Sequence, residues 1–169
     1  MKIRFAIQVI GAVAMLLSSG TFADIKKPPV IGKITVLSAQ FMDSQRALID
    51  DLTRRNFGRG FNGNKDHDIA LLQRTLDSGL VSSAQTKELQ AMGIILGDLL
   101  AEDLGMHWVI YEDKLGRSKA LRFKQTEHYL FPVTMISRRR EADNREPVAD
   151  IYQRAYDIIN SQKPPRPFQ

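Results

Sequence analysis

Acidic side chains crowd one end of a long apolar segment, which is an arrangement that general acid–base chemistry can use. Asp98, Glu102 and Asp103 lie within one short stretch. Two neighbouring carboxyl groups can act as acid and base when burial separates their pKa values. More often such groups form ion pairs, and Arg117 and Arg122 follow in the next segment as partners. We therefore expect structural pairing, and the alternative is a small hydrolase or cell-wall-modifying enzyme that uses Asp98 or Glu102.

The histidines, serines and glycines lack the spacing that catalysis or metal binding requires. His67, His107 and His128 form no H-x-H or H-E-x-x-H pair, and only His107 enters the hydrolase alternative. No serine lies in a G-x-S-x-G turn, and the glycine-rich stretch 57–64 lacks the Lys-Ser or Lys-Thr ending of a nucleotide loop. The sequence therefore predicts no catalytic residue, no metal and no cofactor.

The first residues of the chain have the order of a secretory signal peptide. Lys2 and Arg4 are followed by an apolar run and then by a small-residue exit that ends at Ala23. The apolar run is shorter than the roughly 20 residues that cross a bilayer. We expect cleavage between Ala23 and Asp24, a mature form without a transmembrane segment, and a periplasmic or secreted location. Cysteine is absent, so the core must hold the fold without disulfides.

Charge gives a weaker indication of partners. The formal net charge of +5 includes Lys2 and Arg4, which leave with the signal. Basic residues gather from Arg138 to Arg140, and such a cluster is most often a solvated helix end. If it binds, Arg139 and Arg140 are the candidates, and the partner is an acidic surface of the cell envelope. Nucleic acid is not expected in this compartment.

The elements that must position these groups fit one domain of ordinary size. Turn and extended-chain signals divide the sequence into a signal peptide (1–23), an extended leader (24–37), a single α+β domain (38–162) and a Pro-rich tail (163–169). The expected elements around the centre are a short edge strand at 33–37 and helices at 38–56, at 66–78 and from 147 onward, the first of them capped by Ser38.

The central element is an expected helix over about 83–104, opened by Ser82 or Ser83 and ended by Gly105. Apolar residues cover almost its whole circumference, which is typical of a buried helix. Gly93 and Gly97 lower helix propensity, so their presence predicts close approach of another element along that face.

A β-hairpin is expected next, over about 106–124, with its turn at 113–116. A lone hairpin is marginal in water, so it must pack on the central helix or gain a third strand. The segment 131–136 is the candidate strand, but Pro132 equally allows a short helix through Arg138. The fold class is therefore α+β, with three to four helices around a buried central helix and a small antiparallel sheet.

The central block, roughly Asp68 to Tyr152, resembles an uncharacterised bacterial domain-of-unknown-function family, number thirty-eight-oh-six. The family has no established activity, and the resemblance implies one α+β domain whose W-V strand, D-x-x-G-R turn and A-L-R strand form one hairpin. The motifs that carry the resemblance are Leu71-Leu72-Gln73-Arg74, Glu88-Leu89-Gln90, Leu96-Gly97-Asp98, Leu104-Gly105-Met106-His107-Trp108-Val109, Asp113 with Gly116-Arg117, Ala120-Leu121-Arg122 and Phe131-Pro132.

Within this pattern Trp108, Asp113, Arg117 and Arg122 are the binding candidates. The simplest roles are core packing for Trp108, turn formation for Asp113 and pairing with Asp98 or Glu102 for Arg122. Any further role is expected in a concave surface between the hairpin and the central helix.

The functional hypothesis is a non-catalytic interaction module of the cell envelope that binds an envelope protein through the hairpin or the Arg138–Arg140 cluster. The hydrolase is the first alternative. A weaker one is peptidoglycan binding by the segment Asp68 to Thr86.

Overall fold

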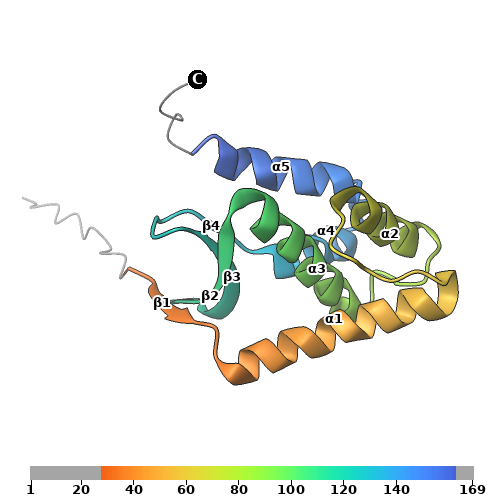
Figure 1. Cartoon of the computed structure of the whole chain (residues 1–169), viewed down its shortest axis with the longest axis horizontal. Coiled ribbons are helices and arrows are strands. Elements are labelled where there is room, and N and C mark those ends of the chain that lie inside the picture. Colours follow the sequence, from red (N-terminus) through yellow and green to blue (C-terminus); the bar gives the residue numbers. More distant parts are fainter. Residues whose placement is uncertain (1–27, 163–169) are drawn as a thin grey trace, which may run out of the picture.

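The computed structural model describes residues 28–162, and the predicted signal peptide and Pro-rich tail lie outside this range. The predicted α+β class is confirmed: helices pack on a small antiparallel sheet that lies at one end of the molecule (Figure 1). In chain order the elements are β1 (Val30–Lys33), α1 (Val36–Phe57), α2 (Lys65–Asp77), α3 (Thr86–Leu104), β2 (Met106–Asp113), β3 (Gly116–Phe123), β4 (Tyr129–Leu130), the 3-10 helix η1 (Pro132–Thr134), α4 (Ser137–Glu141) and α5 (Val148–Asn160).

Helix α3 is the centre of the fold, as its apolar circumference predicts. Eleven of its residues are buried, and α1, α2, α4, α5, η1 and the sheet all contact it. It begins at Thr86 rather than at residue 83, so the predicted start was wrong. The reason is local: the Gln85 side chain accepts a hydrogen bond from the Ser82 N–H at 2.8 Å, and residues 82–85 form a turn before the helix.

The two helix glycines mark the predicted close approach. A Cβ at Gly93 would lie 2.5 Å from the carbonyl oxygens of Pro132 and Val133, and one at Gly97 would lie 2.5 Å from the Trp108 ring. The 3-10 helix η1 and the Trp108 side chain therefore rest directly on the α3 backbone. This contact fixes the sheet and the following segment against the central helix.

The sheet has four antiparallel strands in the order β1-β2-β3-β4. The predicted hairpin is confirmed, with Asp113 paired to Gly116 across the turn, and the Asp113 carboxylate accepts a hydrogen bond from the Leu115 N–H at 2.8 Å. Turn formation is the role expected for Asp113.

The third strand lies before the segment 131–136, which the sequence left open between a strand and a short helix. Strand β4 is Tyr129–Leu130, whereas 131–136 is not a strand. Pro132 has no N–H to donate to a sheet and a fixed φ that suits a helix start, so the chain turns into η1 and then into α4. The alternative of a short helix through Arg138 was closer to the structure.

The N-terminal elements are also shifted. The edge strand lies at Val30–Lys33 instead of 33–37, because Thr35 caps α1: its hydroxyl accepts a hydrogen bond from the N–H of Ser38 at 3.2 Å. Ser38, the predicted cap, is therefore already inside the helix. Helix α2 agrees with its predicted range to within one residue at each end, and α5 begins after Pro147 as expected.

The last helix is held by polar contacts as well as by its apolar face. The Tyr152 hydroxyl donates a hydrogen bond to Asp103 on α3, and Lys65 on α2 pairs with the same carboxylate at 3.2 Å. Burial, followed by this bond to Asp103, raises the pKa of Tyr152 well above its usual value. The helices α2, α3 and α5 are thus tied at one carboxylate. Within residues 28–162, no helix is long and apolar enough to cross a membrane.

Candidate functional site

Asp98 is paired, as the sequence suggests, but with a different arginine. The Arg46 guanidinium, from α1, donates to both carboxylate oxygens at 2.7 and 2.8 Å, and Trp108 Nε1 donates to Oδ1 at 2.9 Å. The hydrogen bond to Asp98 is the main cause that raises the pKa of Arg46. Because both oxygens of Asp98 already accept strong hydrogen bonds, this geometry gives no support to a role as general base.

Arg122 is not the partner of Asp98 or Glu102, so that prediction was wrong. Its guanidinium donates to the carbonyl oxygens of Thr126 and Gln125 at 2.8 and 3.1 Å, and it pairs with Glu127 at 3.3 Å. Arg122 therefore holds the loop that connects β3 to β4. Its place in the sheet directs it there, since it points to the face opposite Trp108.

The other carboxylate and histidine of the hydrolase alternative are on the surface. Glu102 is exposed at the rim of a shallow hollow of about 320 Å³, which Asp98 also lines, and His107 is exposed on the sheet. Among the described residues no group of three His, Cys, Asp or Glu side chains has the arrangement of a metal site.

The predicted basic cluster is divided by the fold. Arg139 is a structural residue that bridges Glu146 at 2.6 Å and the Met135 carbonyl at 2.7 Å. Arg140 turns towards a hollow of about 390 Å³ beside the end of α2, and one of its terminal nitrogens is buried without a partner among the described residues. Of these three arginines only Arg138 is exposed, and it lines a further hollow.

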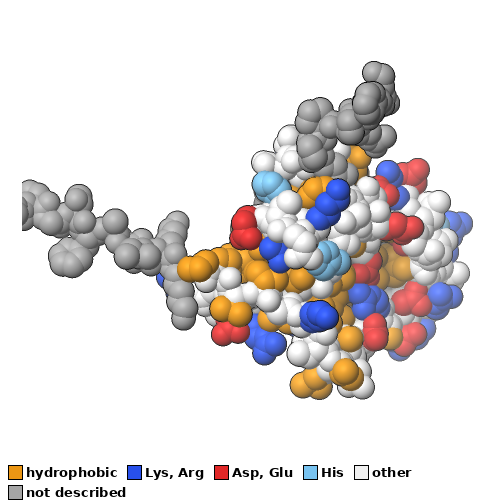
Figure 2. Space-filling model, turned by 60° about the vertical axis from the view of Figure 1, so that its left-hand side comes forward, with side chains coloured by type: hydrophobic (Ala, Val, Ile, Leu, Met, Phe, Trp, Pro, Cys, Tyr) orange, Lys and Arg blue, Asp and Glu red, His pale blue; other side chains and the backbone are white. Residues whose placement is uncertain are grey.

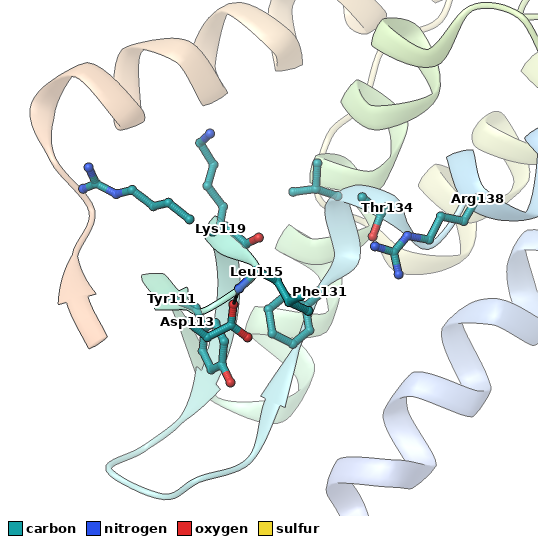
Figure 3. Close-up of a pocket in the computed structure, with 11 residues that line it drawn as sticks. Tyr111, Asp113, Leu115, Lys119, Phe131, Thr134 and Arg138 are labelled. Carbon is teal, nitrogen blue, oxygen red and sulfur yellow. Dashed lines mark hydrogen bonds between the residues drawn. The ribbon is translucent and has the colours of Figure 1, made fainter. Parts of the chain in front are cut away.

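That hollow, the hairpin groove, lies between the tip of the β2–β3 hairpin and the segment 131–138. Its volume is about 550 Å³, within the range of known ligand pockets. Lys119 and Arg138 lie on opposite sides of it and Phe131 lies between them, whereas Tyr111 lies on the same side as Lys119 (Figure 3). The groove is lined by Tyr111, Asp113, Leu115, Gly116, Arg117, Ser118, Lys119, Phe131, Val133, Thr134 and Arg138. Of the binding candidates, Asp113 and Arg117 are here, whereas Trp108 and Arg122 are not.

Aromatic rings give the groove a rigid apolar wall. The Tyr111 ring meets Tyr129 and Phe131 edge to face, with centroid distances of 5.0 and 5.2 Å. At the tip of the hairpin Leu115 is 89% exposed. Apolar side chains also gather over the sheet end of the molecule, interrupted by Lys and Arg (Figure 2). Leu115 and the ordered rings therefore expose apolar side chains beside the groove.

The charge of the groove is positive. Arg117, Lys119 and Arg138 line it, and none of them lies within ion-pair distance of a described carboxylate. Lys119 lies over the Phe41 ring at 4.4 Å; burial, and then the neighbouring Arg117, lower its pKa below the usual value. Asp113 is the one carboxylate in the lining, and it is already engaged in the turn. An anionic partner is therefore favoured.

The sequence interpretation missed Tyr111, Lys119, Phe131 and Thr134 as neighbours. It expected a concave surface between the hairpin and the central helix, but η1 fills that space by packing on Gly93. The groove forms between η1 and the outer edge of β3, where Pro132 ends the line of β4. Strict alternation along 106–113 does assign Tyr111 to the face opposite Trp108, and this was the available signal.

These features define an α+β domain in which one buried helix carries a four-stranded antiparallel sheet with an open groove at the hairpin. The family model described as Domain of unknown function (DUF3806) matches residues 68–152, half of the chain, and the chain belongs to this family. The predicted family is thus confirmed. The matched range contains the hairpin groove and Asp98, whereas Arg46 lies outside it.

A crystal structure from Bacteroides thetaiotaomicron VPI-5482, determined at 1.50 Å resolution, has a similar fold, with a TM-score of 0.70 at 20% sequence identity. The match covers 80% of this chain and 50% of that chain, so this chain spans about half the length of the solved protein. No curated protein matches the sequence. These comparisons show the fold and the family.

Proposed function

We propose that this protein is a non-catalytic interaction module of the cell envelope that binds another protein through the hairpin groove. The observation that carries the proposal is the combination, at one place, of exposed Leu115, the Tyr111 and Phe131 rings and three cations that pair with no carboxylate of residues 28–162. Aromatic anchors beside a charged rim are the features that concentrate binding energy at protein interfaces.

The proposed location rests on the sequence alone. The basic, apolar and small-residue order of the first 23 residues is that of an exported precursor, and the partner would then be an envelope protein. The two alternatives have less support. Both oxygens of Asp98 accept hydrogen bonds from Arg46 and one also from Trp108, which argues against the hydrolase. No observation on the Asp68 to Thr86 segment favours peptidoglycan binding over a structural role.

The test is site-specific photo-cross-linking in cells that express the full chain with its N-terminal segment. A photoreactive amino acid replaces Leu115, which is 89% exposed, or, as a matched control, Ile158, which is 51% exposed on α5. We expect one reproducible adduct with an envelope protein at position 115 and none at position 158. Mass spectrometry of the recovered protein should show that its N-terminal peptide begins at Asp24.

Equal adducts at both positions, or none at position 115, would contradict a binding role for the groove. A recovered protein that still begins at Met1 would contradict export. The purified partner provides the last check, because Leu115→Asp should weaken its binding to the full chain while Ile158→Asp leaves it unchanged.

A further inference from the structure

One edge of the sheet is open beside the hairpin groove. Strand β4 pairs only with Leu121 and Arg122 of β3, and within residues 28–162 no strand pairs with the outer side of 116–120. The line of β4 would continue along this edge, but Pro132 turns the chain into η1. The open part of β3 is about 17 Å long at the usual rise per residue.

The backbone groups on this edge point towards the groove. The Phe123 N–H donates to the His128 carbonyl at 3.0 Å, so Phe123 directs its backbone polar groups to the outer side of β3. In antiparallel sheets these groups alternate between the two sides along a strand. Lys119 and Arg117, two and three pairs of residues nearer the turn, therefore present their N–H and C=O groups to the same outer side, where β4 has ended.

The two faces beside this edge differ in chemistry. Arg117 and Lys119 project on the face that carries Trp108, because Lys119 is paired with Ile110 and Arg117 with Glu112. Ser118 projects on the other face, where it is paired with Tyr111 of β2. The Phe131 ring packs against the Tyr111 ring on that face, with a centroid distance of 5.2 Å. A strand added here would meet cations with every second side chain and aromatic rings with the side chains between.

We propose that the hairpin groove binds an extended segment of a partner protein as an added β-strand along residues 117–120, and that this segment alternates acidic and apolar residues. Backbone hydrogen bonds to Arg117 and Lys119 supply affinity, and the alternating side chains supply selectivity. This inference rests on the proposed function and specifies the chemistry of its partner.

Charge argues against two other occupants. The Pro-rich segment 163–169 of this chain carries Lys163 and Arg166 and no acidic side chain, so it does not complement the groove. A second copy that paired β3 with β3 would bring Arg117 and Lys119 of both copies together, and like charges opposite one another destabilise a strand pair. An acidic segment of another protein has neither difficulty.

The test uses a blocked hexapeptide that alternates glutamate and valine, added to the ¹⁵N-labelled protein and followed by NMR. We expect shift changes confined to the groove and slower amide exchange at Arg117 and Lys119. A peptide of the same sequence with every backbone nitrogen methylated keeps the charge but cannot donate hydrogen bonds to β3 in either strand direction, and its binding should be at least about 10-fold weaker. A peptide with lysine in place of glutamate should not bind.

Two double variants distinguish the effect of charge in the groove from the effect of the net charge of the protein. Arg117→Glu with Lys119→Glu should weaken binding by about 10-fold or more, because attraction becomes like-charge repulsion. Arg55→Glu with Arg59→Glu, at exposed positions outside the groove, changes the net charge equally and should leave binding unchanged.

Equal binding of the N-methylated peptide would overturn strand addition, and equal weakening by both double variants would overturn the site. Concentration-dependent broadening along β3 without peptide would assign the edge to a second copy instead, and protection of the same amides only by anionic lipid vesicles would assign it to a membrane surface. If no peptide binds but position 115 still yields a protein adduct, the strand proposal fails while the proposed function stands.

Discussion

At the scale of the residue, the carboxylate of Asp98 joins three parts of the fold. It accepts hydrogen bonds from Arg46 on α1 and from Trp108 on β2, and it lies on α3. We predict that Asp98→Asn lowers the free energy of unfolding by about 1 kcal/mol or more, because a half-buried guanidinium loses its charged acceptor. Urea unfolding measures this, and Trp108, the single tryptophan, should report the loss by its fluorescence.

The same arginine offers a matched control. Asp43 also pairs with Arg46, at 2.8 Å, but its side chain is 73% exposed. Asp43→Asn should change stability by no more than about 0.5 kcal/mol, as is usual for solvated ion pairs. If the two variants were equally stable, Asp98 would not be the structural link that its geometry indicates, and a functional role for its charge would return to consideration.

The Asp98 pair also shows what sequence reasoning cannot reach. That a buried helix carrying Asp98 needs a cationic partner follows from the cost of desolvation. Which arginine supplies it depends on how α1 is rotated against α3, and Arg46 is separated from Asp98 by 52 positions in the chain. Arg122 is nearer to Asp98 in the sequence, but strand alternation directs its side chain to the face of the sheet opposite Trp108.

At the scale of the element, the contact between α3 and η1 reverses the usual effect of a glycine-to-alanine substitution on stability. Gly→Ala in a helix interior ordinarily stabilises by about 1 kcal/mol. A Cβ at Gly93 would lie 2.5 Å from two backbone carbonyl oxygens, which a side-chain rotation cannot relieve. We therefore predict that Gly93→Ala lowers the free energy of unfolding, by about 1–3 kcal/mol as in overpacked cores, measured by urea denaturation.

Gly32 provides the comparison for that variant. A Cβ there meets only the Ile110 side chain, at 3.7 Å, which is ordinary contact. Gly32→Ala should therefore keep the stability of the parent chain. A Gly93→Ala protein as stable as Gly32→Ala would mean that η1 does not rest on α3 as described, and the position of the groove beside η1 would have to be revised.

Elements whose structure is set by a local sequence pattern could be predicted. Elements whose position depends on the path of the chain in space were harder to predict. The apolar circumference of α3 and the Asp-x-x-Gly turn each specify one structure through short-range chemistry. The segment after β4 was ambiguous because apolar residues suit either a strand or a helix, and Pro132 decided it. The hairpin groove exists only because of that turn, so it could not be seen before the path of 131–138 was known.

At the scale of the whole molecule, two carboxylates fasten α5 to the rest of the fold. Glu146 pairs with Arg139 on α4 and with Arg154 on α5, and the bond from Arg139 is the main cause that lowers its pKa. Asp103 is bound by Tyr152 and Lys65, and the Tyr152 hydrogen bond is the main cause that lowers its pKa. Both carboxylates therefore favour the folded state when they are ionised.

The sign of the pH dependence follows from the lowered pKa values. The stabilising contribution is complete above the ordinary values of 4.5 for Glu146 and 3.8 for Asp103, and it is lost as the pH falls through the lower values of the folded state. We predict that the free energy of unfolding falls as the pH decreases below about 4.5, with amide exchange increasing first in α5. Urea unfolding and hydrogen exchange between pH 7 and pH 3 measure the two effects.

A pair of variants tests whether these carboxylates cause the loss of stability at acid pH. Glu146→Gln removes one of the two carboxylates, so its stability should depend less on pH below 4.5 than that of the parent chain. Asp51→Asn, at an exposed carboxylate that pairs with no cation of the described residues, should leave the dependence unchanged. Because the hairpin groove lies on the sheet and α4 rather than on α5, binding of the acidic hexapeptide at pH 5 should be equal in all three proteins. If peptide binding at the groove weakened together with the stability of α5, the two ends of the molecule would open as one unit.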